Sequence, residues 1–388
     1  MNRHVMLMLS PLLLAPMTGA QPTTLPRMVD LKTNDGIILK ASYFAAAKPG
    51  PGVLLLHQCN RQRKVWDDLA GQLTASGINV LTFDLRGFGE SGDKPFDKLT
   101  PQENASVQAE KWPGDIDVAL QYLVSQPGVT RDVIGVGGAS CGVNNSIQTA
   151  RRNPGAVKSL VLLSGGTDFA GRKFLRDAKQ PQLFAVADDD EFRPTVEIMP
   201  WLFGVSLNPG KKLIHYAKGG HGSDMFSMHP ELRSAIVDWY VQTLIKTPGS
   251  APPSANEPTP ASAQILSQLE APGGIERVAQ KLAEVRKKDP KAALFPEAVV
   301  NVMGYEHLQA GDTTGALDLM KLNVSAYPES PNTYDSLSDI YLAEGQKDLA
   351  RQNAKKALEL LATDTADPEA RRKLIRASAE QKLKQLGE

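Results

Sequence analysis

Two residues of nucleophilic type, Ser140 and Cys141, stand side by side in GVGGASCGVNNSI, residues 135–147. Either a hydroxyl or a thiol attacks a carbonyl once a base activates it. Gly138 and Gly142 frame the serine in a G-x-S-x-G pattern, whereas alanine and valine flank the cysteine at that spacing. The pattern is typical of a sharp strand-to-helix turn that exposes its middle side chain. It favours the serine, and an ordinary glycine turn is the alternative.

A histidine in a glycine-rich loop is the candidate base. His221 lies in AKGGHGSDMF, and a histidine between loop glycines is poorly explained by core packing. The other positions have ordinary explanations: His215 lies in an expected strand, His229 at a helix start and His307 in the helical C-terminal part. We therefore predict that His221 acts as a general base.

An acidic run supplies the third candidate. The segment PQLFAVADDDEFRP, residues 181–194, is an apolar strand that runs out into Asp188, Asp189 and Asp190. A solvated turn would explain the first two. Asp190 precedes Pro194 by four residues, and we favour it as the acid. The resulting chain order of serine, aspartate and histidine is that of an α/β-hydrolase.

The elements that must position these residues are short apolar strands alternating with helices. Residues 28–44 alternate apolar and polar side chains around an Asp35–Gly36 turn, which predicts a β-hairpin. Apolar runs such as GVLLLH, INVLTFDL and SLVLLSG then alternate with stretches of helical length up to about residue 245. This pattern predicts the α/β class, with a mostly parallel sheet covered by helices on both faces.

Four segments together resemble a known superfamily. They are LLLHQ, FDLRGFGESG, KWPGDIDVALQYLVSQPGV and GGASCG, and they are similar to the dienelactone hydrolase and serine-aminopeptidase-like branches of the α/β-hydrolases over residues 30–245. The resemblance implies a Ser140–Asp190–His221 triad. It also implies an oxyanion hole formed by the backbone N–H groups of Cys59 and Cys141.

This sequence departs from the pattern of that superfamily at several positions. Gln58 stands where a glycine is common, Ala187 replaces a glycine and Arg193 replaces a valine of the acid motif. Dienelactone hydrolases use a cysteine nucleophile, whereas the matching residue here is a serine. The departures argue against a dienelactone substrate. His57, at the end of the expected third strand, is interpreted as a structural residue and not as a second base.

The proposed oxyanion hole has a consequence for the two cysteines. If both amides face one oxyanion, Cys59 and Cys141 are neighbours although 82 positions separate them, and a disulfide between them would staple the hole. The alternative is two buried free thiols that act as small apolar side chains. Two cysteines alone cannot form a structural zinc site, and no metal or cofactor is expected.

The C-terminal part has a different pattern. A proline-rich linker is expected at 247–263, and a helical domain at 264–388. A shift of 34 residues places Leu308 on Leu342, Gly311 on Gly345 and Ala316 on Ala350, which resembles tetratricopeptide repeats. Helices at 264–288 and 366–386 are expected to cap the stack. The domain would bind a peptide or protein partner, support self-association or cover the active site.

The N-terminal residues indicate where the protein is located, and its net charge limits the kinds of partner it can bind. Residues 1–20 have a basic start, an apolar run and a small-residue end at Ala20, the layout of a signal peptide cleaved there. We expect a periplasmic or secreted protein without a membrane span. Lys+Arg and Asp+Glu are both 43, and this neutrality argues against nucleic acid as a partner.

The function predicted from these observations is that of a serine hydrolase acting on a small-molecule ester, with residues 21–246 as the catalytic domain. Peptidase or thioesterase activity on a short peptide or thioester is the alternative within that class. A catalytically inactive hydrolase domain serving a repeat-based binding or scaffold protein is the alternative outside it. The short segment 167–180 between the sixth and seventh strands predicts an open site without a large lid.

Overall fold

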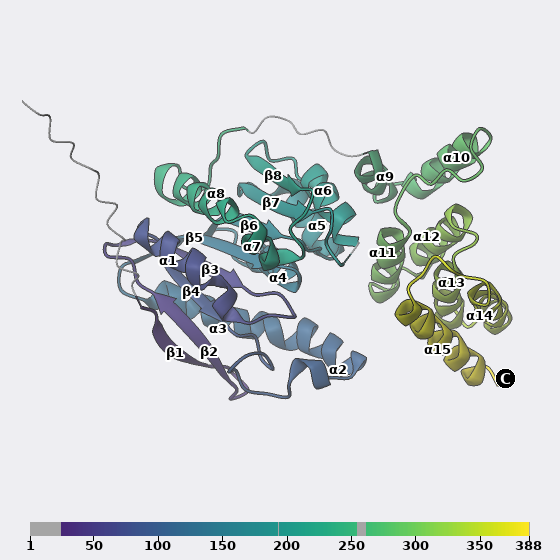
Figure 1. The fold of residues 1–388 in the computed structure, drawn as a ribbon, viewed down its shortest axis with the longest axis horizontal. Coiled ribbons are helices and arrows are strands. Elements are labelled where there is room, and N and C mark those ends of the chain that lie inside the picture. Colours follow the sequence, from purple (N-terminus) through teal and green to yellow (C-terminus); the bar gives the residue numbers. More distant parts are fainter. Residues whose placement is uncertain (1–24, 193, 254–260, 388) are drawn as a thin grey trace, which may run out of the picture.

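The computed structural model describes residues 25–192, 194–253 and 261–387, so the predicted signal peptide lies outside the described residues. The described residues form one eight-stranded sheet in the order β1-β2-β4-β3-β5-β6-β7-β8 (Figure 1). Its strands are β1 (Arg27–Lys32), β2 (Ile38–Phe44), β3 (Gly50–Leu56), β4 (Asn79–Phe83), β5 (Val129–Ala139), β6 (Val157–Leu163), β7 (Gln182–Ala187) and β8 (Lys211–Tyr216). Strands β3 to β8 run parallel to one another, and β1 and β2 are antiparallel. The predicted mostly parallel sheet is confirmed.

The antiparallel start of the sheet is the predicted hairpin. Gly36 has φ 88°, a left-handed conformation that glycine adopts without strain. The amide of Ile37 donates to the hydroxyl of Thr33, which fixes the turn between β1 and β2. The hairpin adds two strands to the edge of the sheet, next to β4.

Helices cover both faces of the sheet and enclose two apolar cores. One face packs against α1 (Asp67–Ala75) and α8 (Glu231–Tyr240). The other packs against α3 (Trp112–Ser125), α4 (Cys141–Arg152), α5 (Phe169–Asp177) and α6 (Pro194–Val205). The shorter elements are α2 (Pro101–Ser106), α7 (Met225–Met228), the 3₁₀ helices η1 (Arg63–Trp66), η2 (Phe96–Lys98) and η4 (Gly222–Asp224), and the π-helices η3 (Val107–Lys111) and η5 (Val241–Lys246). Strands with buried side chains on both faces explain the continuous apolar runs of the sequence.

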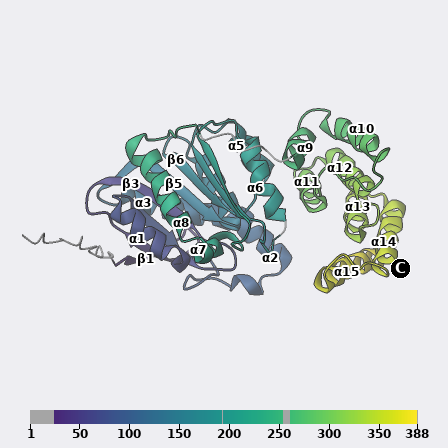
Figure 2. The same ribbon diagram turned by 45° about the horizontal axis from the view of Figure 1, so that its top comes forward.

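The C-terminal part is all helical and lies beside α5 and α6 (Figures 1 and 2). It consists of α9 (Ala261–Leu269), α10 (Gly274–Arg286), α11 (Glu297–Gln309), α12 (Thr313–Ala326), α13 (Pro331–Ala343), α14 (Lys347–Leu361) and α15 (Glu369–Gln385). The pair α11–α12 and the pair α13–α14 begin 34 residues apart at both helices. Each copy of the repeat is therefore one helix pair.

Small side chains hold the paired helices close together. A Cβ on Gly304 would lie 2.6 Å from the terminal methyl group of Met320. In the next pair, the Ser338 hydroxyl donates to the carbonyl oxygen of Ala350 across the helices. These are equivalent positions of the repeat, and at both a larger side chain would push the two helices apart.

The segment before the repeats differs from the prediction. The expected single helix at 264–288 is two helices, α9 and α10, because the chain turns at Gly273, which has φ 63°. Helix α9 begins at residue 261, inside the predicted linker, and packs against α6 of the sheet region. It connects the repeats to the sheet region in addition to capping them. Within the described residues, no helix is long and apolar enough to cross a membrane.

Candidate active site

The backbone at Ser140 has an unusual conformation for a residue with a side chain. Ser140 joins β5 to α4 with φ 53° and ψ −120°. Positive φ is strained for L-residues, and such strain gathers at functional sites. Its N–H donates to the carbonyl oxygen of Leu163 on the neighbouring strand β6, which holds the turn in place. The geometry is that of a sharp strand-to-helix turn, and its middle residue, Ser140, is half-buried.

The two glycines of the G-x-S-x-G pattern are required by space. A Cβ on Gly138 would overlap the carbonyl oxygen of Gly142, and a Cβ on Gly142 would overlap the carbonyl oxygen of Leu56 at the end of β3. The turn therefore brings β5, α4 and β3 so close together that only glycine fits at either position.

Cys141 is joined to Cys59 in a disulfide, with the two Cα atoms 5.9 Å apart. A sulfur in a disulfide carries no thiolate, so Ser140 is the nucleophile candidate of the adjacent pair. The bridge joins the residue after the serine to the loop that follows β3. Because Cys141 is the first residue of α4, its N–H has no acceptor within the helix. This N–H and that of Cys59 remain the proposed oxyanion donors.

His221 and Asp190 form a buried hydrogen-bonded pair. The Nδ1 atom of His221 lies 2.9 Å from both carboxylate oxygens of Asp190. The carboxylate also accepts from the amide of Phe192 at 2.8 Å and from the hydroxyl of Thr195 at 2.7 Å. An ionised carboxylate accepts only, so Nδ1–H donates to it and the Nε2 lone pair is left for another proton.

The Nε2 atom of His221 has no hydrogen-bond partner among the described residues, so this structure does not bring it into hydrogen-bond contact with Ser140. Long catalytic hydrogen bonds are common in enzymes without substrate. The two loops are nevertheless adjacent, because a Cβ on Gly222 would lie 3.2 Å from the side chain of Ala139. The residue after the histidine thus touches the residue before the serine.

The remaining aspartates of the acidic run have separate contacts. Asp188 lies 2.7 Å from the Nε2 atom of His215 at the exposed end of β8. Asp189 accepts from the amides of Gly219 and Gly220 at 2.8 and 2.9 Å, and the amide of Gly220 holds the pKa of its carboxyl below the usual range. Asp189 is therefore more than part of a solvated turn, because it fixes the loop that carries the histidine.

Gln58 is buried beside the candidate site. From the sequence it is notable only because it stands where a glycine is common in the superfamily. Its Oε1 atom accepts from the amide and the hydroxyl of Ser223 at 2.7 and 2.9 Å. Its Nε2 atom donates to the carbonyl oxygen of His221 at 3.4 Å and to Asn60 at 2.9 Å. The glutamine thus ties the histidine loop to the loop that carries Cys59. No periodicity links residues 165 positions apart, so the sequence held no signal for this contact.

His57 has the structural role expected of it. Its Nδ1–H donates to the carbonyl oxygen of Gln58 at 2.9 Å, and its Nε2 atom accepts from the amide of Leu85 at 3.0 Å. Both ring nitrogens are used by the backbone, and burial lowers the pKa of the imidazole. A neutral ring with two fixed partners cannot act as a second base.

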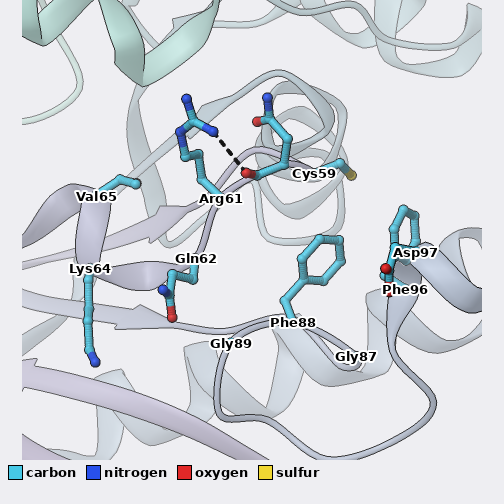
Figure 3. Close-up of a pocket in the computed structure, with 11 residues that line it drawn as sticks. Cys59, Arg61, Gln62, Lys64, Val65, Gly87, Phe88, Gly89, Phe96 and Asp97 are labelled. Atoms are coloured by element: carbon cyan, nitrogen blue, oxygen red, sulfur yellow. Dashed lines mark hydrogen bonds between the residues drawn. The ribbon is translucent and has the colours of Figure 1, made fainter.

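A cavity of about 600 Å³ opens beside Cys59 (Figure 3). Phe88 and Phe96 form its aromatic wall, with their ring centroids 4.6 Å apart. Arg61 lies at the opposite side and forms an ion pair with Asp224 at 2.9 Å. The cavity adjoins the disulfide through its lining residue Cys59. Within the described part of the chain, no group of three or more His, Cys, Asp or Glu side chains is arranged to hold a metal ion.

Part of the chain is similar to known hydrolases. Residues 47–187 match the family model described as serine aminopeptidase, S33. Thiohydrolase aneE of Aspergillus aculeatus is 29% identical over 113 residues, which are 29% of this chain and 33% of that protein. Thiohydrolase apmlB of Arthrinium phaeospermum is 24% identical over 131 residues, or 34% of this chain and 40% of that protein. The chain thus spans well under half the length of these curated relatives.

Solved structures that resemble this chain include an esterase and a dienelactone hydrolase. The Pyrococcus furiosus esterase Pf2001 is 18% identical, with a TM-score of 0.46 over 60% of this chain and 96% of that one. The dienelactone hydrolase of Anabaena variabilis is also 18% identical, with a TM-score of 0.45 over 56% of this chain and 99% of that one. The family match and the observed strand order together confirm the α/β-hydrolase fold predicted for residues 30–245.

Proposed function

We propose that the protein is a serine hydrolase that cleaves carboxylic esters through Ser140, His221 and Asp190. The observation that carries the proposal is the state of the histidine. Its Nδ1–H is held by a buried carboxylate, its Nε2 atom has no partner among the described residues, and its loop touches the strained turn of the serine. An imidazole whose Nδ1–H is held in this way can accept a proton only at Nε2, which is the arrangement of a general base.

The proposed reaction proceeds through an acyl-enzyme. His221 takes the proton of the Ser140 hydroxyl as the oxygen attacks the ester carbonyl carbon. Asp190 keeps the Nδ1 tautomer and stabilises the imidazolium that forms. The amides of Cys59 and Cys141 donate to the developing oxyanion, each worth about 2.7–4 kcal/mol. His221 then protonates the leaving alcohol, and a water activated by the same histidine releases the acid.

Thioester hydrolysis is the second candidate, and the two curated relatives favour it because both are named thiohydrolases. The same triad would serve, since a thiolate is a better leaving group than an alkoxide. Amide hydrolysis of short peptides is a further candidate activity, because residues 47–187 match the serine aminopeptidase family model. The three substrate classes share the attack step and differ in the leaving group.

Export and partner binding complete the proposal. We propose that the leader 1–20 directs the chain to the periplasm or the medium, where an oxidising environment preserves the Cys59–Cys141 disulfide. We also propose that the C-terminal helical pairs serve a protein partner or self-association in addition to the role argued below. Mass measurement of the exported protein, which would show residue 21 as the new N-terminus, tests the leader.

Labelling with a fluorophosphonate probe tests the nucleophile. Wild type is expected to react, and Ser140→Ala is expected to lose all labelling. Ser125→Ala, at the exposed end of α3, is the matched control and is expected to label like wild type. A wild type that fails to label, or equal labelling of Ser140→Ala, would support the inactive scaffold instead. Steady-state rates on p-nitrophenyl esters, acyl thioesters and aminoacyl anilides then rank the three substrate classes.

A further inference from the structure

A second cavity, of about 250 Å³, lies between the sheet region and the C-terminal helices. Its lining on the sheet side includes Asn144 of α4, Gly166 after β6 and Ile198 of α6. Its lining on the other side comes from α11 and includes Val302 and Met303. Figure 2 shows α11 beside α6, consistent with the contacts between the two helices. The cavity is therefore complete only when the C-terminal helices are in place.

The two parts are held together there by buried charges. Arg172 of α5 is 3% exposed, and its guanidinium contacts Glu270 at 2.6 Å and Glu306 of α11 at 2.5 Å. The same guanidinium lies over the ring of Trp201, 4.7 Å from its centroid. Trp201 is buried in a common core with Leu266 and other side chains of the C-terminal helices. These contacts fix α11 relative to the sheet region.

The chemistry of the cavity wall selects an apolar group. Its polar side chains have partners: the hydroxyl of Thr167 donates to the Asn144 side chain at 2.7 Å, Asp168 accepts from the Gln148 side chain at 2.8 Å, and Arg172 pairs with Glu306. The other lining side chains are aliphatic, aromatic or thioether groups: Ile198, Trp201, Val299, Val302 and Met303. Val302 is aliphatic, 43% exposed, and one of the residues that line the cavity. A volume below the roughly 300–1,000 Å³ of drug-sized sites suits a short aliphatic chain.

The position of the cavity relative to Ser140 indicates which part of an ester substrate the cavity would bind. Asn144 follows Ser140 by one turn of α4, about 5.4 Å along the helix. Gly165, next to the lining residue Gly166, lies so close to Ser140 that a Cβ there would overlap the serine carbonyl oxygen. The cavity therefore begins within about one helical turn of the nucleophile.

The histidine approaches the serine from the other face of the sheet. Gly222 touches Ala139, whose side chain belongs to the core under α1 and α8, whereas Ile198 packs on the core under α4 and α6. The leaving alcohol must lie on the side of His221, which protonates it. The acyl group then extends to the opposite side, toward α11.

We propose that the cavity between α6 and α11 binds the aliphatic chain of the substrate's acyl group, so that the C-terminal helices form one wall of the substrate site. The inference rests on the proposed ester hydrolysis and adds the acyl specificity and its source. It makes Val302 a specificity-determining residue, although it lies far from the triad in the sequence.

Acyl-chain profiles test the proposal. We would measure kcat/KM for p-nitrophenyl acetate, butyrate, hexanoate and octanoate with the full-length protein. Wild type is expected to prefer a chain longer than acetate. Val302→Trp, which fills the cavity, is expected to lower kcat/KM for butyrate and longer chains at least about tenfold and to change acetate by less than about twofold. Gln309→Trp, an exposed residue of the same helix outside the cavity, is expected to match wild type at every length.

A second variant keeps the test independent of folding defects. Val302→Ala enlarges the cavity and is expected to shift the optimum toward longer chains by a few-fold. A parallel loss at all lengths in Val302→Trp, no change in either variant, or a wild type that cleaves acetate but rejects butyrate overturns the proposal. A change confined to a series of alkyl acetates, which vary the alcohol, also overturns it. If wild type cleaves no ester at all, the proposed function fails instead, and the two failures are thus distinct.

Discussion

The two sides of Ser140 are held by different means. On the β3 side, a covalent bond between Cys59 and Cys141 and the buried hydrogen bonds of Gln58 fix the loops within the catalytic part of the chain. On the α11 side, the sheet region is attached to the C-terminal helices by the ion pairs of Arg172 and by the packing of Trp201. The ion pair between Arg172 and Glu306 joins residues more than a hundred positions apart in the chain. The residues of the proposed triad and oxyanion hole come from one region, whereas one wall of the proposed substrate site comes from another.

The difference follows from what each side must do. Donors to an oxyanion and a general base act only within about 0.5 Å of the productive geometry, so their supports must be rigid. An aliphatic wall tolerates changes of size and shape at a cost of less than about 1.5 kcal/mol when volume is kept. Non-covalent attachment is therefore sufficient on the α11 side, and that wall can change without disturbing the triad.

The largest expected effect is on kcat, and it tests whether the acid of the proposed triad is Asp190. Asp190→Asn is expected to lower kcat about 10⁴-fold, because an amide no longer selects the Nδ1–H tautomer of His221. Steady-state hydrolysis of a p-nitrophenyl ester at saturation measures it. Asp188→Asn, which alters the exposed contact with His215, is the control and is expected to retain activity. Comparable losses in both variants would show that Asp190 is not the acid of the triad.

Removing the charge at the interface tests the other side. Arg172→Met leaves the largely covered carboxylates of Glu270 and Glu306, 14% and 17% exposed, without their partner, and we expect a loss of up to about 3–5 kcal/mol in the free energy of unfolding. Burial already raises the pKa of Glu270. A carboxyl with a raised pKa in the folded state destabilises folding as the pH rises above its unfolded value, so the variant should be weaker at pH 8 than at pH 5.

Thermal denaturation at the two pH values measures this effect, with Arg176→Met, an exposed arginine of the same helix, as the control. Acetate hydrolysis per folded molecule is expected to persist in Arg172→Met. If the difference in stability between Arg172→Met and Arg176→Met is the same at pH 5 and pH 8, the assignment of the ion pairs is contradicted.

Loss of the disulfide tests the covalent side. The double variant Cys59→Ser/Cys141→Ser is expected to lose about 2–4 kcal/mol of stability, since the bridge closes a long loop. Its kcat should fall by less than the roughly 10²-fold that removing one oxyanion donor costs, because both amides remain. Reductant should reproduce both losses in wild type and leave the variant unchanged. Wild type that is indifferent to reductant would show that the bridge does not position the hole.

The smallest expected effect concerns His57. Burial lowers the pKa of its imidazole in the folded state, so the unfolded chain binds more protons between the folded pKa and the ordinary value of 6.5. The contribution of His57 to the free energy of unfolding is therefore complete above about pH 6.5 and decreases as the pH falls below that value. His57→Asn should be about 1 kcal/mol less stable at pH 7.5, because the contact with the Leu85 amide is lost.

Chemical denaturation between pH 5 and pH 8 measures this slope in both proteins. The difference in stability between wild type and His57→Asn should shrink toward pH 5, since only the wild type loses the histidine contribution. A constant difference across the range would mean that the ring does not titrate with folding.

What could be predicted from the sequence depended on how far apart the interacting residues are along the chain. The turn at Ser140 is local, because Gly138 and Gly142 lie two residues on either side and each is required by the space the turn leaves. The choice of Asp190 over its neighbours rested on a four-residue spacing to Pro194, which begins α6. Strand and helix periodicity likewise act within a window of a few turns.

The contacts that were missed join distant residues through single side chains. Gln58 and Ser223 are 165 positions apart, and Arg172 and Glu306 are 134 apart. No repeating pattern marks such pairs, so only the folded structure reveals them. The prediction of an open site considered only the short segment between β6 and β7, where α5 lies. It could not include α11, which approaches that segment from the far end of the chain.

The bridge between Cys59 and Cys141 also turns the chain between them into a closed covalent ring. That ring includes Lys98, the last residue of the short helix η2, whose side chain is 70% exposed and accessible to trypsin. Cleavage after Lys98 would leave two fragments still joined through sulfur. A nicked molecule would therefore migrate as one species on a denaturing gel without reductant and as two with it, and it would keep Ser140 covalently joined to both Cys59 and Cys141.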